Sequence, residues 1–178
     1  MSEQKDITLL KVQRELKPKI EDMIHTCLEG DAKEIALEFA QYMQTLKMPL
    51  KWAGVHNAWR ALHKGKAICY VKFPRGENDK ERAGGKWAII PNTDNLKSCY
   101  ADVIVSEGLQ HIFWDNAFHC MFCRTPCYGS PPGMDKVVLG KEMKSICYNR
   151  QLIWANDPSK ADVKIIKRLL QLELQARG

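Results

Sequence analysis

Residues 57–73, NAWRALHKGKAICYVKF, decide the fold class of this chain. Two short β-prone runs flank a turn that contains glycine, and this arrangement predicts a β-hairpin. KWAII at residues 86–90 predicts a third strand, which Pro91 ends. Because these strands follow one another without the strand–helix–strand rhythm of a parallel sheet, we expect a small antiparallel sheet of about three to five strands within residues 50–92.

Two helices are expected ahead of this sheet. Apolar residues recur at helical spacing over residues 18–28. A second apolar stripe runs from Ile35 to Leu46, and Pro49 stops it. Residues 1–48 therefore predict an N-terminal helical hairpin.

The chain after the sheet predicts further helices around a loop. Ser106 is expected to cap a helix that leads into the cysteine-rich segment. A short strand ending at Leu139 and a turn follow that segment. Residues 156–177 give the clearest helical pattern of the chain, and either Asp157 or Ser159 is expected to cap it.

Length and composition indicate one α+β domain over residues 1–178, divided into 1–48, 50–92 and 100–178. The 45% hydrophobic and 27% charged residues are typical of an ordinary globular protein. The sequence shows neither an apolar run of the ~20 residues that a bilayer span needs nor a signal peptide. We therefore expect a cytoplasmic protein without a membrane partner. In that compartment its seven cysteines favour thiols or metal ligation over disulfides.

The net charge of +6 is mild, and the basic residues are spread along the chain. Nucleic-acid binding would need a basic stripe interleaved with stacking aromatic residues. The charge pattern therefore favours a solvated surface, and a weak nucleic-acid-binding module remains only as an alternative function.

The segment HCMFCRTPCYGSPPG, which begins at His119, carries the most distinctive chemistry. Cys120, Cys123 and Cys127 have the spacing C-x2-C-x3-C, and Cys147 follows after nineteen intervening residues. Zinc prefers such thiolates in tetrahedral geometry, and a structural ion can replace the apolar core that a loop lacks. The pattern predicts a zinc site made by the four cysteines, in which His119 could replace one of them.

Other interpretations of the cysteines stay open. A thiol-redox or nucleophilic role would fall to Cys120 or Cys123, but the dipole at the end of a preceding helix disfavours a thiolate there. An iron–sulfur cluster also needs four cysteines, although ferredoxin spacings are tighter and repeated. Plain packing is the third alternative. Cys27, Cys69 and Cys99 are expected to be core residues.

Aromatic residues of the strands form the second candidate site. Trp52, Trp59, Tyr70 and Trp87 fall on neighbouring predicted strands. If the exposed face of the sheet carries them, they could bind a flat or apolar small molecule. The alternative, that the tryptophans belong to the core, is favoured over ligand binding.

Two parts of the sequence resemble known proteins. HCMFC followed by a third cysteine, PPG, VVLGKE, a further cysteine, NDP and a closing helix resembles an uncharacterised Firmicutes family of small cysteine-containing α+β proteins. AWRALHKGKAICYVKFP is similar to a broader set of small bacterial α+β domains. The resemblance implies a compact fold loosely like that of small-molecule-binding sensor domains, with no known activity. The matching positions are Cys120, Cys123, Cys127, Gly133, Gly140, Lys141 and Cys147.

The sequence thus predicts a non-enzymatic small-molecule-binding or sensor-like domain whose C-terminal loop is pinned by zinc. Its ligand is an unknown small molecule. The main alternative is a thiol-redox or cysteine-nucleophile enzyme.

Overall fold

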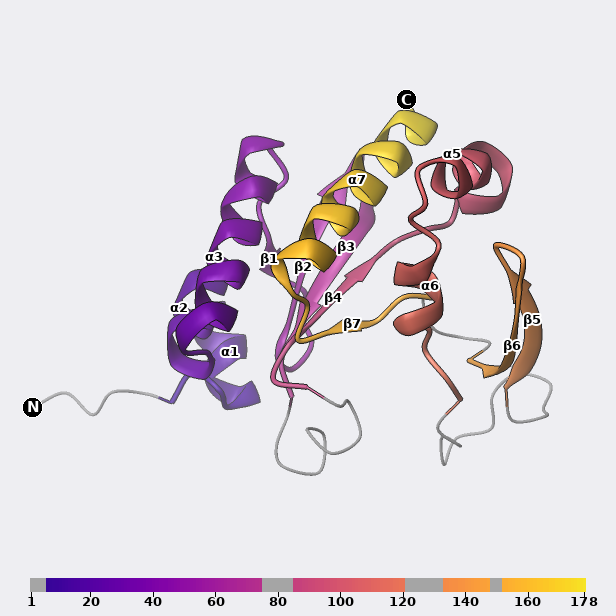
Figure 1. The fold of residues 1–178 in the computed structure, drawn as a ribbon. Coiled ribbons are helices and arrows are strands. Elements are labelled where there is room, and N and C mark those ends of the chain that lie inside the picture. Colours follow the sequence, from indigo (N-terminus) through magenta and orange to yellow (C-terminus); the bar gives the residue numbers. More distant parts are fainter. Residues whose placement is uncertain (1–5, 75–84, 121–132, 148–151) are drawn as a thin grey trace, which may run out of the picture.

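The computed structural model describes residues 6–74, 85–120, 133–147 and 152–178 (Figure 1). Its helices are α1 (Leu10–Leu16), α2 (Ile20–Cys27), α3 (Gly30–Thr45), the π-helical turn η1 (Leu96–Tyr100), α5 (Ala101–Ser106), α6 (His111–Asp115) and α7 (Lys160–Arg177). Its strands are β1 (Lys51–Trp52), β2 (Ala58–His63), β3 (Lys66–Lys72), β4 (Ala88–Pro91), β5 (Met134–Val138), β6 (Lys141–Ile146) and β7 (Ala155–Asn156). The α+β class with N-terminal helices and a C-terminal helix is confirmed.

The main antiparallel sheet of the described residues has five strands in the order β1-β2-β3-β4-β7. The predicted hairpin forms its centre. Lys64 and Gly65 join β2 to β3 with φ angles of 47° and 80°, and two positive φ angles in succession are typical of a type I′ turn. The predicted third strand is β4, which pairs with β3. The fifth strand, β7, comes from beyond the cysteine segment and was not predicted.

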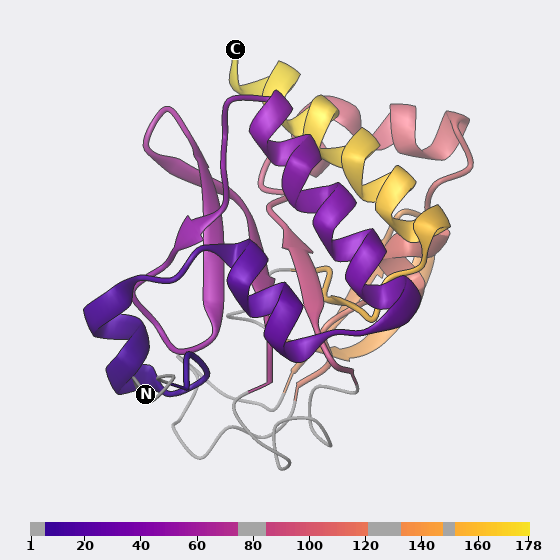
Figure 2. The ribbon, with the colours of Figure 1, turned by 90° about the vertical axis from the view of Figure 1, so that its left-hand side faces the viewer.

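Helices α2, α3 and α7 cover one face of this sheet, which we call the inner face (Figures 1 and 2). Strand pairing aligns Trp59, Val71 and Ile89 in one row across three strands. All three side chains are buried. Because side chains alternate along a strand, the neighbouring row with Arg60 and Tyr70 lies on the opposite, outer face.

The closing helix α7 begins with the predicted cap. Ser159 Oγ accepts a hydrogen bond from the backbone N–H of Asp162, whose carboxylate accepts one from the N–H of Ser159. This reciprocal arrangement is a capping box. Asp157, the other candidate, instead accepts hydrogen bonds from the backbone N–H groups of Lys86 and Trp87. It therefore ties the start of α7 to the start of β4.

The prediction that Ser106 begins a helix is wrong. Ser106 is the last residue of α5, and α6 follows as a separate helix. Gly108 between them has a φ of 68°, a left-handed conformation that one continuous helix cannot contain. The apolar residues Ile104 and Ile112 are therefore buried by two short helices rather than by one.

Helix α1 has no counterpart in the predictions, because its buried residue is polar. Gln13 is fully buried. Its Oε1 accepts hydrogen bonds from the backbone N–H of Asn57 at 2.9 Å and from Trp52 Nε1 at 3.2 Å. Its Nε2 donates to the carbonyl of Ile7 and to the Asn57 side chain. A polar network, rather than an apolar stripe, holds α1 against the sheet.

Gln13→Ala is expected to lower the free energy of unfolding by about 2–3 kcal/mol, because it leaves buried donors of Asn57 and Trp52 without an acceptor. Chemical denaturation monitored by circular dichroism measures this change. Arg14→Ala, at the exposed neighbouring position on the same helix, is the control. Equal effects of the two substitutions would contradict the importance of the network.

Candidate metal site and cavity

Along the chain, the cysteine segment comes after α6 and before the strands of a small second sheet. Strands β5 and β6 pair antiparallel, and Leu139 and Gly140 join them with φ angles of 48° and 84°. The predicted short strand and turn are therefore confirmed, and β6 continues the hairpin. Figure 1 shows the hairpin beyond α6, on the opposite side of the molecule from α2 and α3.

An extended segment, residues 116–120, follows α6 and leads into the cysteine loop. Its first part pairs with the chain just before β7. The backbone N–H of Phe118 donates to the carbonyl of Leu152 at 3.0 Å, and that of Trp154 donates to Asn116 at 2.8 Å. This pairing connects the cysteine segment to the main sheet through β7.

The second part of the same segment pairs with the end of β6, where His119 lies opposite Ile146. Backbone hydrogen bonds donated by Cys147, at 2.9 Å, and by Cys120, at 2.7 Å, flank this pair. Because side chains alternate along each strand, Cys120 and Cys147 project from one face and His119 from the other. The cysteines occupy diagonal positions, where Cβ atoms are typically within about 7–8 Å. The backbone pairing thus places Cys120 and Cys147, two of the four predicted ligands, at neighbouring positions on paired strands.

The surroundings of these residues differ. Cys147 is 4% exposed and lies outside the core cluster of the described residues, whereas Cys120 is half-buried. His119 is exposed, and its Nδ1 lies 3.0 Å from the carbonyl oxygen of Lys144. A hydrogen bond donated by Nδ1 leaves Nε2 free for a metal, but the register directs the ring away from both cysteines. His119 is thus separated from Cys120 and Cys147, and the four-cysteine set stays a prediction.

No other cysteine among the described residues extends the site. Cys123 and Cys127 lie outside the described residues, and the described part of the chain contains no group of three or more potential metal ligands. Burial raises the pKa of Cys69 to about 12, so it is an unreactive core thiol, as predicted. Cys27 packs against the core, also as predicted. Cys99 is exposed on η1, so its predicted place in the core is wrong.

The four aromatic residues of the second candidate site do not share a surface. Trp59 and Trp87 are 0% and 2% exposed and belong to the core. Trp52 pairs with Trp59 and lies half-buried on the same inner face. Tyr70 is half-buried in the row that points outward. The tryptophans therefore pack in the way that the core alternative describes, and ligand binding by these four residues stays a prediction.

Contacts of the buried tryptophans fit this interpretation. Trp59 Nε1 donates to the carbonyl of Pro18 at 3.0 Å, which fixes the chain between α1 and α2 to the sheet. Its ring meets Phe73 edge to face, with centroids 5.7 Å apart. Trp87 Nε1 is buried and has no hydrogen-bond partner among the described residues.

The outer face carries groups that the nucleic-acid alternative would use. Lys51, Arg60 and Tyr70 form one row across β1, β2 and β3. Ile90 continues this row on β4 but is only 2% exposed. The row is therefore not an open stacking platform along its whole length, and nucleic-acid binding stays a prediction.

A buried carboxylate on α7 is a polar centre that the sequence predictions missed. Glu173 is fully buried and accepts hydrogen bonds from Tyr100 Oη at 2.7 Å, from Asn95 Nδ2 at 2.7 Å and from Arg177 Nε at 2.9 Å. Burial alone would raise the pKa of Glu173, but these hydrogen bonds lower it below its usual value. Burial and the contact with Glu173 raise the pKa of Tyr100. The signal in the sequence that could have revealed this centre is the acidic residue Glu173 on the apolar stripe of the last helix.

A cavity of about 250 Å³ lies between α3 and α7. Its lining combines apolar side chains, one acid and several lysines of α7: Ile35, Glu38, Lys160, Val163, Lys164 and Lys167. The i, i+4, i+7 spacing of the lysines places them on one side of a helix. That spacing was visible in the sequence, but the cavity depends on how α3 and α7 pack.

None of the helices in the described part of the chain is both long and apolar enough to cross a bilayer.

The candidate sites of the described residues are the paired cysteines and the cavity lined by lysines. The chain matches no family model, no curated protein and no solved structure.

Proposed function

We propose that the chain is a non-enzymatic small-molecule-binding domain whose cysteine segment is closed by a structural zinc ion. Cys120, Cys123, Cys127 and Cys147 would hold the ion. The pairing of His119 with Ile146 gives the main support, because it puts two cysteines that are distant in sequence on one face. Zinc would supply no reaction there, only a cross-link between thiolates.

The backbone around the two paired cysteines supports a structural role. Cys120 and Cys147 both donate backbone hydrogen bonds across the pairing, so the fold would hold two of the proposed ligands in place before a metal binds. Binding to a ligand set that is already partly formed has a lower entropic cost. The small-molecule part of the proposal is supported by the cavity between α3 and α7.

Metal analysis of protein purified without chelator is expected to find one zinc per chain. Cys120→Ser and Cys147→Ser are each expected to reduce the zinc content to well under half an equivalent. Both should speed proteolysis of the segment equally, because each removes one ligand from the same ion. Cys99→Ser, at an exposed cysteine on η1, is the matched control. His119→Ala is expected to retain zinc.

Wild-type protein with well under one equivalent of zinc would refute the zinc proposal. In that case, rapid alkylation of Cys120 or Cys123 near neutral pH would favour the thiol-redox or nucleophile alternative. Uniformly slow alkylation of the native protein would remove that alternative as well.

A further inference from the structure

We propose that the cavity between α3 and α7 binds the phosphate or pyrophosphate group of a small ligand. The inference rests on the proposed function in so far as the chain is treated as a binding domain, but it does not need the zinc site. It gives the ligand a chemical class and a location between α3 and α7. That location is separate from the aromatic residues on the strands.

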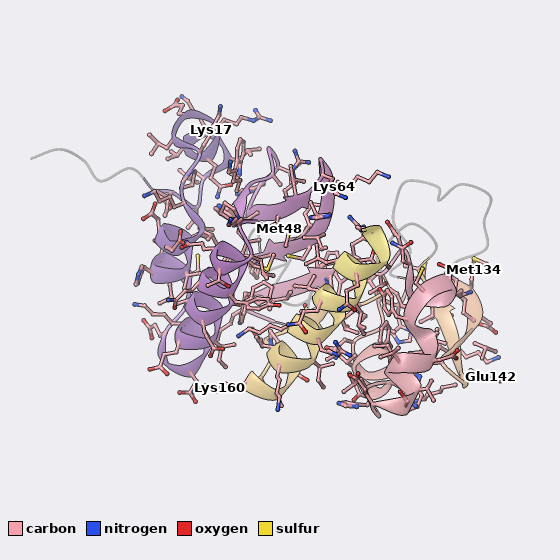
Figure 3. All side chains as sticks on the ribbon, turned by 90° about the horizontal axis from the view of Figure 1, so that it is seen from above. Lys17, Met48, Lys64, Met134, Glu142 and Lys160 are labelled. Atoms are coloured by element: carbon pink, nitrogen blue, oxygen red, sulfur yellow. The ribbon has the colours of Figure 1, made fainter. Side chains whose placement is uncertain are left out.

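The shape of the cavity comes from two helices that run side by side (Figure 2). Ile35 on α3 and Val163 on α7 form its apolar part and are 7% and 3% exposed. Lysine side chains of α7 line it above this floor, and Figure 3 shows the first of them, Lys160, at the start of the helix. The cavity therefore joins an apolar surface to a row of cationic groups.

The charges in this cavity do not balance. Three ammonium groups face one carboxylate, that of Glu38. Lys167 is paired with it, with Nζ 2.5 Å from Oε1, and also lies 5.0 Å over the ring of Tyr42. Lys160 and Lys164 form no close ion pair in the part of the chain that the structure describes, although Lys160, after Lys167, helps to lower the pKa of Glu38. The side chains that line the cavity thus carry two more positive charges than negative ones.

This arrangement is unfavourable for α7 by itself. Lys160 occupies the first turn, where the helix dipole disfavours a positive charge. Lys160 and Lys164 are four residues apart, a spacing at which like charges on a helix repel. A multiply charged anion in the cavity would relieve both effects. The capping box of Ser159 already satisfies the helix terminus, so the lysines themselves would hold the anion.

Phosphate fits this site better than a carboxylate would. Lysine binds phosphate as a point charge, and several flexible ammonium groups can share the oxygens of one pyrophosphate. The volume of about 250 Å³ is below the lower end of ordinary ligand pockets, which begin near 300 Å³. The ligand is therefore small, and a dinucleotide cofactor is too large.

Calorimetric titration with inorganic pyrophosphate at low salt tests this proposal. Wild-type protein is expected to bind one pyrophosphate per chain. Lys160→Gln and Lys164→Gln are each expected to weaken binding by about tenfold, the usual effect of losing one charge-assisted hydrogen bond near a surface. Lys11→Gln, an exposed lysine on α1 outside the cavity lining, is the matched control and should leave the affinity unchanged.

Glu38→Gln gives a prediction of opposite sign. It removes the carboxylate from the cavity and releases Lys167 from its ion pair, so pyrophosphate is expected to bind at least about threefold more tightly. General attraction to a basic protein would make Lys11→Gln as harmful as Lys164→Gln. That result, no binding by the wild type, or weaker binding by Glu38→Gln would overturn the proposal.

Zinc content separates this test from that of the zinc site. The lysine variants are expected to keep their zinc and to be at least as stable as the wild type, because each removes an unfavourable charge from α7. A wild-type protein that holds zinc but binds no pyrophosphate would refute the anion site alone. Pyrophosphate binding by a zinc-free chain would remove the metal site alone.

Discussion

Glu173→Ala is expected to lower the free energy of unfolding by about 3–5 kcal/mol, the usual cost of removing one partner from a buried, hydrogen-bonded ion pair. The substitution leaves the hydroxyl of Tyr100, the amide of Asn95 and the guanidinium of Arg177 without their common acceptor. These donors come from η1, the turn before it and the end of α7. Their loss should therefore loosen η1 from α7 as well as destabilise the whole fold.

Two control variants make this expectation specific. Glu173→Gln keeps an oxygen acceptor but loses the charge, so it should cost less than Glu173→Ala. Glu142→Ala, at an exposed position on the β5–β6 hairpin (Figure 3), should change stability by less than about 0.5 kcal/mol. Denaturant unfolding curves give all three values. A Glu173→Ala protein as stable as Glu142→Ala would show that the buried carboxylate has no stabilising role.

The same carboxylate predicts how stability changes with pH. The folded state lowers the pKa of Glu173 below its usual value of 4.5. Its contribution is therefore fully present above that usual pKa and is lost as the pH falls through the lowered, folded-state pKa. Wild-type protein should accordingly lose more stability in this acid range than Glu173→Gln. Parallel curves for the two proteins would contradict an ionised Glu173.

Gly133→Ala is expected to open the β5–β6 hairpin and to release zinc. Gly133 has a φ of 78°, and a Cβ there would lie 2.7 Å from the backbone Cα and carbonyl carbon of Ser145. Real Cβ atoms do not approach a backbone so closely. The carbonyl of Ser145 also accepts the hydrogen bond from Cys120. Moving Ser145 away would therefore break the pairing that places Cys120 beside Cys147.

Amide hydrogen exchange and zinc analysis measure this result. Protection in β5 and β6 should be lost, and the zinc content should fall well below half an equivalent. Gly140→Ala is the matched control, because Gly140 also has a positive φ but no atom within 4 Å of the added Cβ. Its cost should be only the backbone strain of about 1–2 kcal/mol. Equal hairpin protection in both variants would contradict the steric argument.

The elements that the sequence predicted have apolar patterns or turn residues of their own. The β2–β3 hairpin, helices α2 and α3, and α7 all show such local signals. Helix α1 and the Glu173 centre were missed because polar side chains fill their buried positions, and burial of Gln13 depends on partners as distant as Asn57. The prediction for Ser106 was wrong because a serine can cap the start of a helix or, as here, be its last residue.

The candidate metal site was predictable in composition but not in geometry. Spacing alone identified Cys120 and Cys147 as candidates. Which face each thiol occupies depends on the pairing of His119 with Ile146, and the segments around these residues carry no clear strand pattern. The four aromatic residues of the second candidate site do not share a surface, for a related reason. Strand alternation separates Tyr70 from Trp59 once the register is known, but the sequence does not reveal which face the helices cover.

One piece of backbone connects the two proposed sites. Residues 116–120 pair with β6 at one end and with residues 152–154 at the other. The chain then runs directly through β7 and Asp157 into the first lysine of the cavity, Lys160. If loss of the metal displaced residues 116–120, the displacement would therefore be transmitted through β7 to the start of α7. By thermodynamic reciprocity, any tightening of anion binding by zinc must be matched by an equal tightening of zinc binding by the anion.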